Sequence, residues 1–188
     1  MELPDKAVSV GADGQPDGFE PPDAWTVEVI PGGHTRIVVS LSGGRLEAVH
    51  RALVGALNPP LRVLYVQLVD RAAGQQLDPP NRFVALDVSA DVLDGALADN
   101  RKLVYHDGRH QLWVQGRGQD KVVMEETGVV YVYPDDPLFR DTLLGADVPE
   151  HDAENMANRD YVRVTFLADA DAEESTFRSA LGLVPYGS

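Results

Sequence analysis

The sequence predicts an α+β fold, in which a mixed and mostly antiparallel sheet belongs to a single domain over residues 25–188. Short runs of alternating apolar and polar residues indicate strands, other segments repeat apolar residues at helical spacing, and glycine- or proline-rich turns separate the runs. The 188 residues are 44% hydrophobic and 24% charged, which is ordinary for one globular domain with its own core.

Residues 1–24 have a different composition and are predicted to be a disordered acidic arm. They contain several glycines and prolines, six acidic residues and one base, with few large apolar side chains. Such a segment cannot repay the entropy of ordering.

The first predicted elements are a hairpin and a helix. The apolar runs at residues 25–29 and 37–41 flank a Gly-Gly turn, which favours an antiparallel pair. Ser42 then offers an N-cap, and residues 46–57 carry apolar side chains at helical spacing. The helix must end by Asn58, because two prolines follow.

The next segment predicts a central strand at residues 61–69, a loop at 70–81, a strand at 82–88 and a short helix between Ser89 and Asn100. From about residue 37 to 105 the order is therefore strand, helix, strand, strand, helix, strand. This order predicts a ferredoxin-like βαββαβ core.

Residues 102–133 predict a four-stranded antiparallel meander, because turn signals separate four β-prone runs. Asp107-Gly108 is typical of a type I′ turn, which would pair His106 with Arg109. Trp113 would then lie among polar residues on one sheet face. An aromatic side chain in that position either contacts a partner or is covered by another part of the chain.

The last part of the sequence predicts a helix at residues 138–144, an irregular acidic segment at 147–160, a strand at 161–168 and a final helix. Asp135 and Asp136 precede the first of these helices, where carboxylates satisfy free backbone amides.

The negative charge is concentrated in two regions of the sequence. Thirty acidic and 16 basic residues give a net charge of −14, of which residues 1–24 carry −5 and residues 134–160 carry −6. Residues 25–133 carry only −1. The excess of acid disfavours direct binding to nucleic acid, because phosphates would be repelled.

Motifs for catalysis or metal binding are sparse. Ser42-Gly43-Gly44 precedes a helix but lacks the glycine spacing and lysine of a phosphate-binding loop. His151, Asp152 and Glu154 are the candidate metal ligands, and the alternative for them is a polar surface loop. We expect no metal and no cofactor.

The remaining composition concerns the protein's setting. The sequence has no cysteine, no signal-peptide pattern and no apolar run of membrane-spanning length, so a cytoplasmic location and no membrane contact are expected. Thirteen arginines against three lysines indicate a GC-rich bacterial or archaeal origin.

Together these features favour a non-catalytic acidic interaction protein, such as an inhibitor, an immunity-like protein or an adaptor, that engages a basic protein partner. The alternative is a small-molecule-binding protein or enzyme with a pocket near Trp113 or the Ser42 helix start. The oligomeric state is left open. The candidate partner-binding residues are Trp113, His106, Arg109, Asp135, Asp136, Glu150, Asp152 and Glu154.

Overall fold

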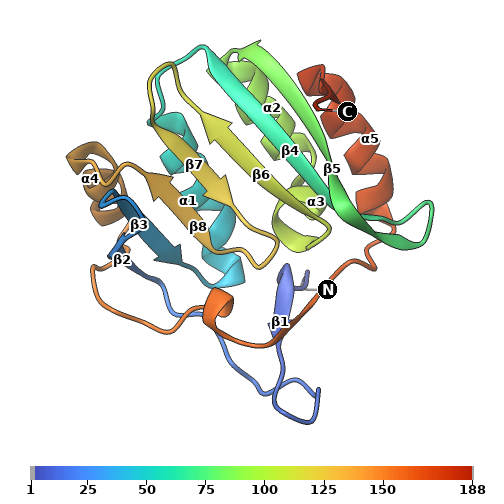
Figure 1. Ribbon diagram of the computed structural model, residues 1–188, viewed down its shortest axis with the longest axis horizontal. Helices are drawn as coiled ribbons and strands as arrows, with labels where there is room; N and C mark the ends of the chain where they lie inside the picture. Colours follow the sequence, from blue (N-terminus) through green and yellow to red (C-terminus); the bar gives the residue numbers. More distant parts are fainter. Residues whose placement is uncertain (1–2, 188) are drawn as a thin grey trace.

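The computed structural model describes residues 3–187, and its main feature is an eight-stranded sheet with the strand order β10-β5-β4-β6-β7-β8-β3-β2 (Figure 1). Every neighbouring pair in this sheet is antiparallel. The α+β class and the mostly antiparallel sheet are confirmed. The strands are β2 (Ala24–Val29), β3 (Thr35–Ser40), β4 (Leu61–Asp70), β5 (Gln75–Val88), β6 (His110–Gln115), β7 (Lys121–Met124), β8 (Val130–Tyr133) and β10 (Val184–Pro185).

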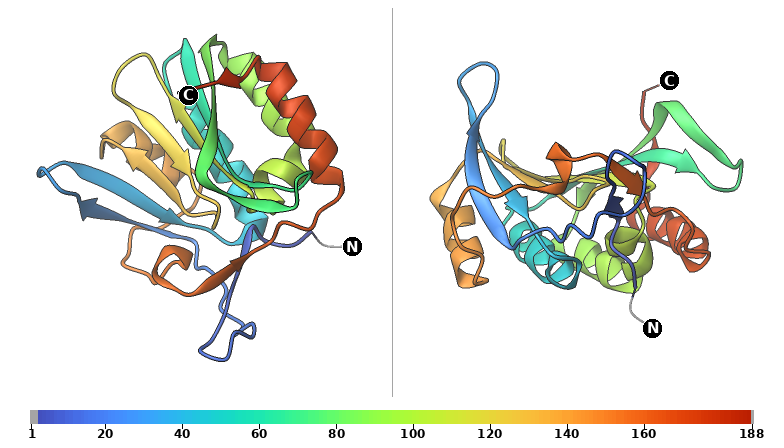
Figure 2. Two further views of the ribbon diagram at one scale, coloured as in Figure 1. Left: turned by 45° about the vertical axis from the view of Figure 1, so that its right-hand side comes forward. Right: turned by 90° about the horizontal axis from the view of Figure 1, so that it is seen from below.

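The helices lie on one face of the sheet, and the main core is between them and the strands (Figure 2). None of the helices within residues 3–187 is long and apolar enough to span a bilayer. On the opposite face, the N-terminal segment and the segment after α4 cover part of the sheet, where Phe19 and Met156 pack on the strands. The helices are α1 (Gly43–Gly55), α2 (Ala90–Asp99), α3 (Arg101–His106), α4 (Pro137–Gly145) and α5 (Asp169–Leu181).

The predicted local signals form several of these elements. The β2–β3 hairpin and the central position of β4, between β5 and β6, are as expected. The Ser89 hydroxyl accepts a hydrogen bond from the Val92 amide at the start of α2, and the Asp136 carboxylate accepts one from the Leu138 amide at α4. Both are N-caps of the kind that satisfies free amides in the first turn.

Helix α3 corrects the predicted four-stranded meander, because it replaces the first of the four strands. Leu103, Val104 and Tyr105 are all buried, whereas a strand on a one-sided sheet would bury alternate residues. The meander therefore has three strands, β6 to β8, and the hairpin pairing of His106 with Arg109 does not occur.

The predicted order of elements between residues 37 and 105 is present as β3, α1, β4, β5 and α2–α3, with the last strand shifted to β6. In the sheet, β7 and β8 lie between β6 and β3. The ferredoxin-like arrangement stays a prediction that these pairings do not confirm. Strand β5 also begins at Gln75, inside the segment expected to be a loop.

The N-terminal segment corrects the expectation of a disordered arm. Strand β1 (Ala7–Ser9) pairs antiparallel with β9 (Tyr161–Arg163) in a separate two-stranded sheet. Lys6 beside it is only 1% exposed. The segment gains order from contacts with the other end of the chain, which its own composition does not reveal. The strand predicted at 161–168 is correspondingly short and lies outside the main sheet.

Candidate functional site

Parts of the two acidic regions of the sequence, residues 10–23 and 147–160, lie along one margin of the molecule, which we call the acidic edge (Figure 1). The Val10 amide donates to the Asp160 carbonyl at 2.9 Å. Trp25, just after the first segment, is itself joined to the second, because its amide donates to the Pro149 carbonyl and its carbonyl accepts from the His151 amide, both at 3.0 Å.

Most carboxylates of the acidic edge are exposed, and one arginine offsets them. The Arg159 guanidinium donates to Asp17 at 2.6 Å, to Glu154 at 2.7 Å and to the Ser9 hydroxyl at 2.7 Å. These contacts hold the two regions together, and the bond from Arg159 lowers the pKa of Asp17. The exposed acids of the edge are Asp13, Asp17, Glu20, Asp147, Glu150, Asp152, Glu154 and Asp160.

The candidate metal ligands do not form a cluster. The side chain of His151 contacts the Asp152 carbonyl at 3.3 Å, and Glu154 is paired with Arg159. No group of three or more histidine or acidic side chains within residues 3–187 is placed to hold a metal ion.

Asp135 and Asp136 serve the start of α4. Asp136 is the N-cap, and Asp135 forms a bidentate ion pair with Arg140 at 2.6 and 2.7 Å. The bonds from Arg140 lower the pKa of Asp135. Of these two predicted partner-binding residues, Asp136 is exposed and Asp135 is largely covered.

Arg109 is not a surface residue, which corrects its prediction as a partner contact. Its side chain is fully buried and donates to Asp107 at 2.8 and 2.9 Å, to Asp171 at 2.6 Å and to Glu174 at 3.3 Å. The Tyr65 hydroxyl donates to the same Glu174 at 2.7 Å. The network ties α5 to the sheet. It uses the N–H donors of the guanidinium within the chain, so none is left for a partner.

A second buried cation, Lys6, fixes the N-terminal segment. Its ammonium donates to the carbonyls of Val104 at 2.9 Å and Asp107 at 2.8 Å. Burial lowers the pKa of Lys6 to about 7, against the opposing charges of Asp107 and Glu126. His106 also holds this segment, through a 2.8 Å bond between its Nδ1 and the Pro4 carbonyl.

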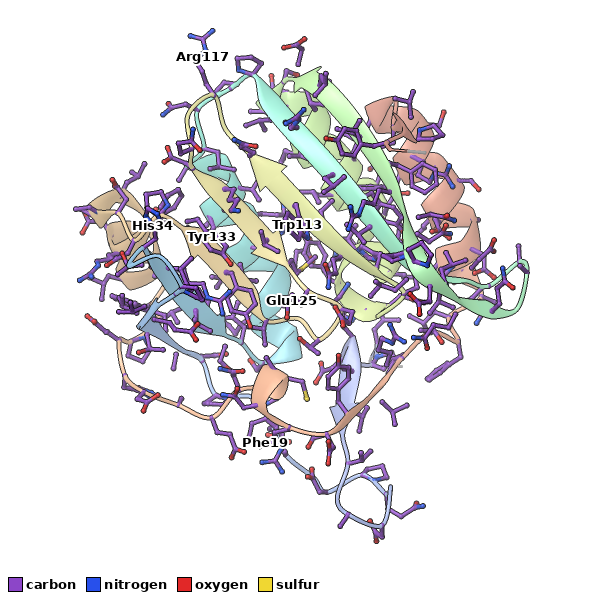
Figure 3. The ribbon with its side chains drawn as sticks, in the orientation of Figure 1. Phe19, His34, Trp113, Arg117, Glu125 and Tyr133 are labelled. Atoms are coloured by element: carbon purple, nitrogen blue, oxygen red, sulfur yellow. The ribbon has the colours of Figure 1, made fainter. Side chains whose placement is uncertain are left out.

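Trp113 lies on the open sheet face, as the alternation of β6 predicted (Figure 3). Its indole N–H donates to Gln111 at 3.3 Å, and the Lys121 ammonium stands 5.7 Å from its ring centre. A hollow of about 130 Å³ lies beside it. The other lining residues are Arg62, Leu64, Val84, Val114, Gln115, Lys121 and Tyr186.

The start of α1, the other predicted pocket position, is occupied by the protein's own carboxylates. The Ser42 amide and hydroxyl both donate to Asp23, at 2.8 and 2.9 Å. A side chain at Gly43 would collide with the Asp5 carboxylate. These two acids stand where a phosphate on the helix N-terminus would need to be.

Sequence reasoning did not single out the cations beside Trp113. Arg62 was visible only as a polar interruption in an otherwise apolar strand, and Lys121 as the first residue of a short β-prone run. The pairing of β4 and β7 with β6 brings both residues to the same hollow. The residues next to them in the sequence do not reveal this pairing.

Comparison with known proteins adds no further information, since no protein-family model, no curated protein and no solved structure matches the chain.

Proposed function

We propose that this chain is a non-catalytic interaction protein, of the inhibitor, immunity-like or adaptor kind, that engages a basic protein through its acidic edge. The observation that supports the proposal is the hydrogen bonding that joins residues 10–23 to residues 147–160. Two acidic segments far apart in sequence therefore present one negatively charged surface.

The charge balance of this surface favours a cationic partner. Within residues 10–23 and 147–160, Arg159 is the one lysine or arginine, and both Asp17 and Glu154 already surround it. The other exposed carboxylates of the edge have no lysine or arginine from these two segments to offset them. Such a surface steers and orients an oppositely charged protein.

The test is a pull-down from cell extract, at low and high salt, with charge-neutralised variants. Glu150→Gln with Asp152→Asn removes two charges from the acidic edge. Asp91→Asn with Asp99→Asn removes the same number from exposed positions on α2 and is the matched control. We expect a basic partner whose capture weakens with salt and with the edge variant, about fivefold or more, but not with the control.

A complex that ignores salt, or that both double variants weaken equally, would contradict the proposal. Failure to capture any basic protein would contradict it as well.

The alternative of a small-molecule-binding protein or enzyme with a pocket near Trp113 or the Ser42 helix start has less support at those two places. The Trp113 hollow of about 130 Å³ is well below the ~300 Å³ at which ligand pockets begin, and Asp5 and Asp23 occupy the start of α1. A cytoplasmic setting and a GC-rich source remain part of the proposal, and the absence of cysteine is compatible with the first of these.

A further inference from the structure

The open face of the sheet has one part that the chain covers and one part that it leaves uncovered. Val38, Val123 and Tyr131 are at most 7% exposed, because Met156 and Phe19 pack on that part of the face. Farther along the same face, across β6, β4, β5 and β10, no segment crosses the strands (Figures 1 and 2). We call this second part the open half-face; its residues are Arg62, Leu64, Val84, Trp113, Val184 and Tyr186, with Lys121 beside them at the start of β7. Trp113 also borders the covered cluster, and Val84, at the floor of the hollow, is 9% exposed.

The segments that cover the first part share one chemistry. Met156 follows Glu154 in the acidic edge and is 2% exposed. Phe19 stands between Asp17 and Glu20 and packs on the same cluster (Figure 3). In both, an acidic stretch of chain places one apolar side chain on the sheet.

The open half-face is complementary to such a stretch in charge and in size. Arg62 and Lys121 stand at the hollow, and neither has a carboxylate within ion-pair distance in the part of the chain that the structure describes. The hollow of about 130 Å³ between Leu64, Val84 and Trp113 is too small for most ligands and suits a single apolar side chain.

We propose that the open half-face docks an acidic segment of a partner protein, which inserts one aliphatic side chain beside Trp113 and sets carboxylates against Arg62 and Lys121. This surface is distinct from the acidic edge. It takes an acidic partner, whereas the partner proposed for the acidic edge is basic. Its apolar residues Val184 and Tyr186, 57% and 48% exposed, would be covered in the complex.

Aromatic rings with nearby cations also occur in surfaces that bind single-stranded nucleic acid. The net charge of −14 would repel the phosphates of such a strand. The Lys121 ammonium also stands 5.7 Å from the ring centre of Trp113, where it would hinder a base from stacking on that side. These observations favour a side chain entering the hollow.

The probe is a short synthetic peptide with a central leucine flanked by aspartates, titrated into the full chain while tryptophan emission is followed. Trp25 is 1% exposed on the helical side of the sheet, so a change in emission reports on Trp113. We expect a saturable change. A peptide with serine in place of leucine should bind about tenfold more weakly, since the hollow then stays unfilled.

The charge requirement is tested with Lys121→Glu and Arg62→Glu, each expected to weaken the peptide about tenfold. Arg101→Glu makes the same charge change on α3, on the helical side, and should leave binding within about twofold. Thermal unfolding by circular dichroism verifies that each variant is folded, and Arg62→Glu, at an exposed position, keeps the test valid if Lys121→Glu does not fold.

Three results would overturn the proposal. These are no saturable change with the acidic leucine peptide, equal binding of a peptide with lysines in place of aspartates, and saturation by an oligothymidine strand in place of the peptide.

Discussion

Replacing Lys6 with methionine should remove a pH dependence that this one buried ammonium gives to the whole fold. Lys6 is 1% exposed, and its pKa is lowered from 10.5 to about 7, chiefly by burial. Methionine keeps much of the side-chain volume without the charge. It leaves the carbonyls of Val104 and Asp107 without this donor, at a cost of about 1–3 kcal/mol each that does not vary with pH.

The magnitude follows from the two pKa values. Below pH 7 both the folded and the unfolded chain protonate Lys6, so the folded state bears the full cost of a buried charge. Between pH 7 and 10.5 the unfolded chain holds a proton that the folded chain has released, so the free energy of unfolding rises with pH. Between pH 7 and 9 the rise amounts to about 2 kcal/mol.

Urea unfolding of the parent and the Lys6→Met variant at pH 6, 7, 8 and 9 measures this difference. Between pH 7 and 9 the free energy of unfolding of the parent should rise by about 2 kcal/mol relative to that of the variant. This rise does not depend on the constant difference in stability between the two proteins. Parallel pH profiles would refute the reasoning, and would mean that the two carbonyls and the charges of Asp107 and Glu126 fully offset the burial of the ammonium.

Three further substitutions test other contacts by chemical unfolding. Trp25→Phe removes the indole donor to the Val148 carbonyl, 3.1 Å away, and should cost about 1–3 kcal/mol and speed hydrogen exchange at the His151 amide, which Trp25 also binds; unchanged exchange would argue against Trp25 as the anchor of the acidic edge. Arg109→Met leaves the fully buried Asp107 carboxylate without its cation and should cost about 3–5 kcal/mol, whereas a loss below about 1 kcal/mol would show the network to be dispensable. Burial and Glu126 raise the pKa of Glu125 to about 7, so ionisation destabilises the fold and the parent should lose stability relative to Glu125→Gln as pH rises from 4.5 to 7; a constant difference would contradict this.

The elements that the sequence predicted well are those with local determinants. The β2–β3 hairpin depends on a Gly-Gly turn between alternating runs, and α2 depends on the Ser89 cap. Each signal lies within a few residues of the structure it specifies.

The elements that it missed depend on contacts between distant segments. Residues 101–106 have an apolar pattern compatible with a strand, and they form α3 because three consecutive side chains are buried beneath neighbouring elements. Strand β1 is ordered by distant parts of the chain, through its pairing with β9 and through the bonds of Lys6 to the carbonyls of Val104 and Asp107.

The candidate site divides in the same way. The concentration of acid in two regions could be read from composition, but their proximity requires the backbone bonds around Trp25 and the bridge through Arg159. The sequence neighbours of Arg109 do not indicate that it is fully buried, since Asp171 and Glu174 come from the last helix.

The pairing of β1 with β9 also sets an order of events during synthesis. Ala7 and Arg163 are partners, so β1 leaves the ribosome about 150 residues before the strand that it needs. At ~5–20 residues per second that interval lasts roughly 8–30 seconds. Until then β1 lacks its partner strand, and the acidic, glycine- and proline-rich residues around it resist aggregation. The composition that looks like permanent disorder thus suits a segment whose partner strand is made so much later.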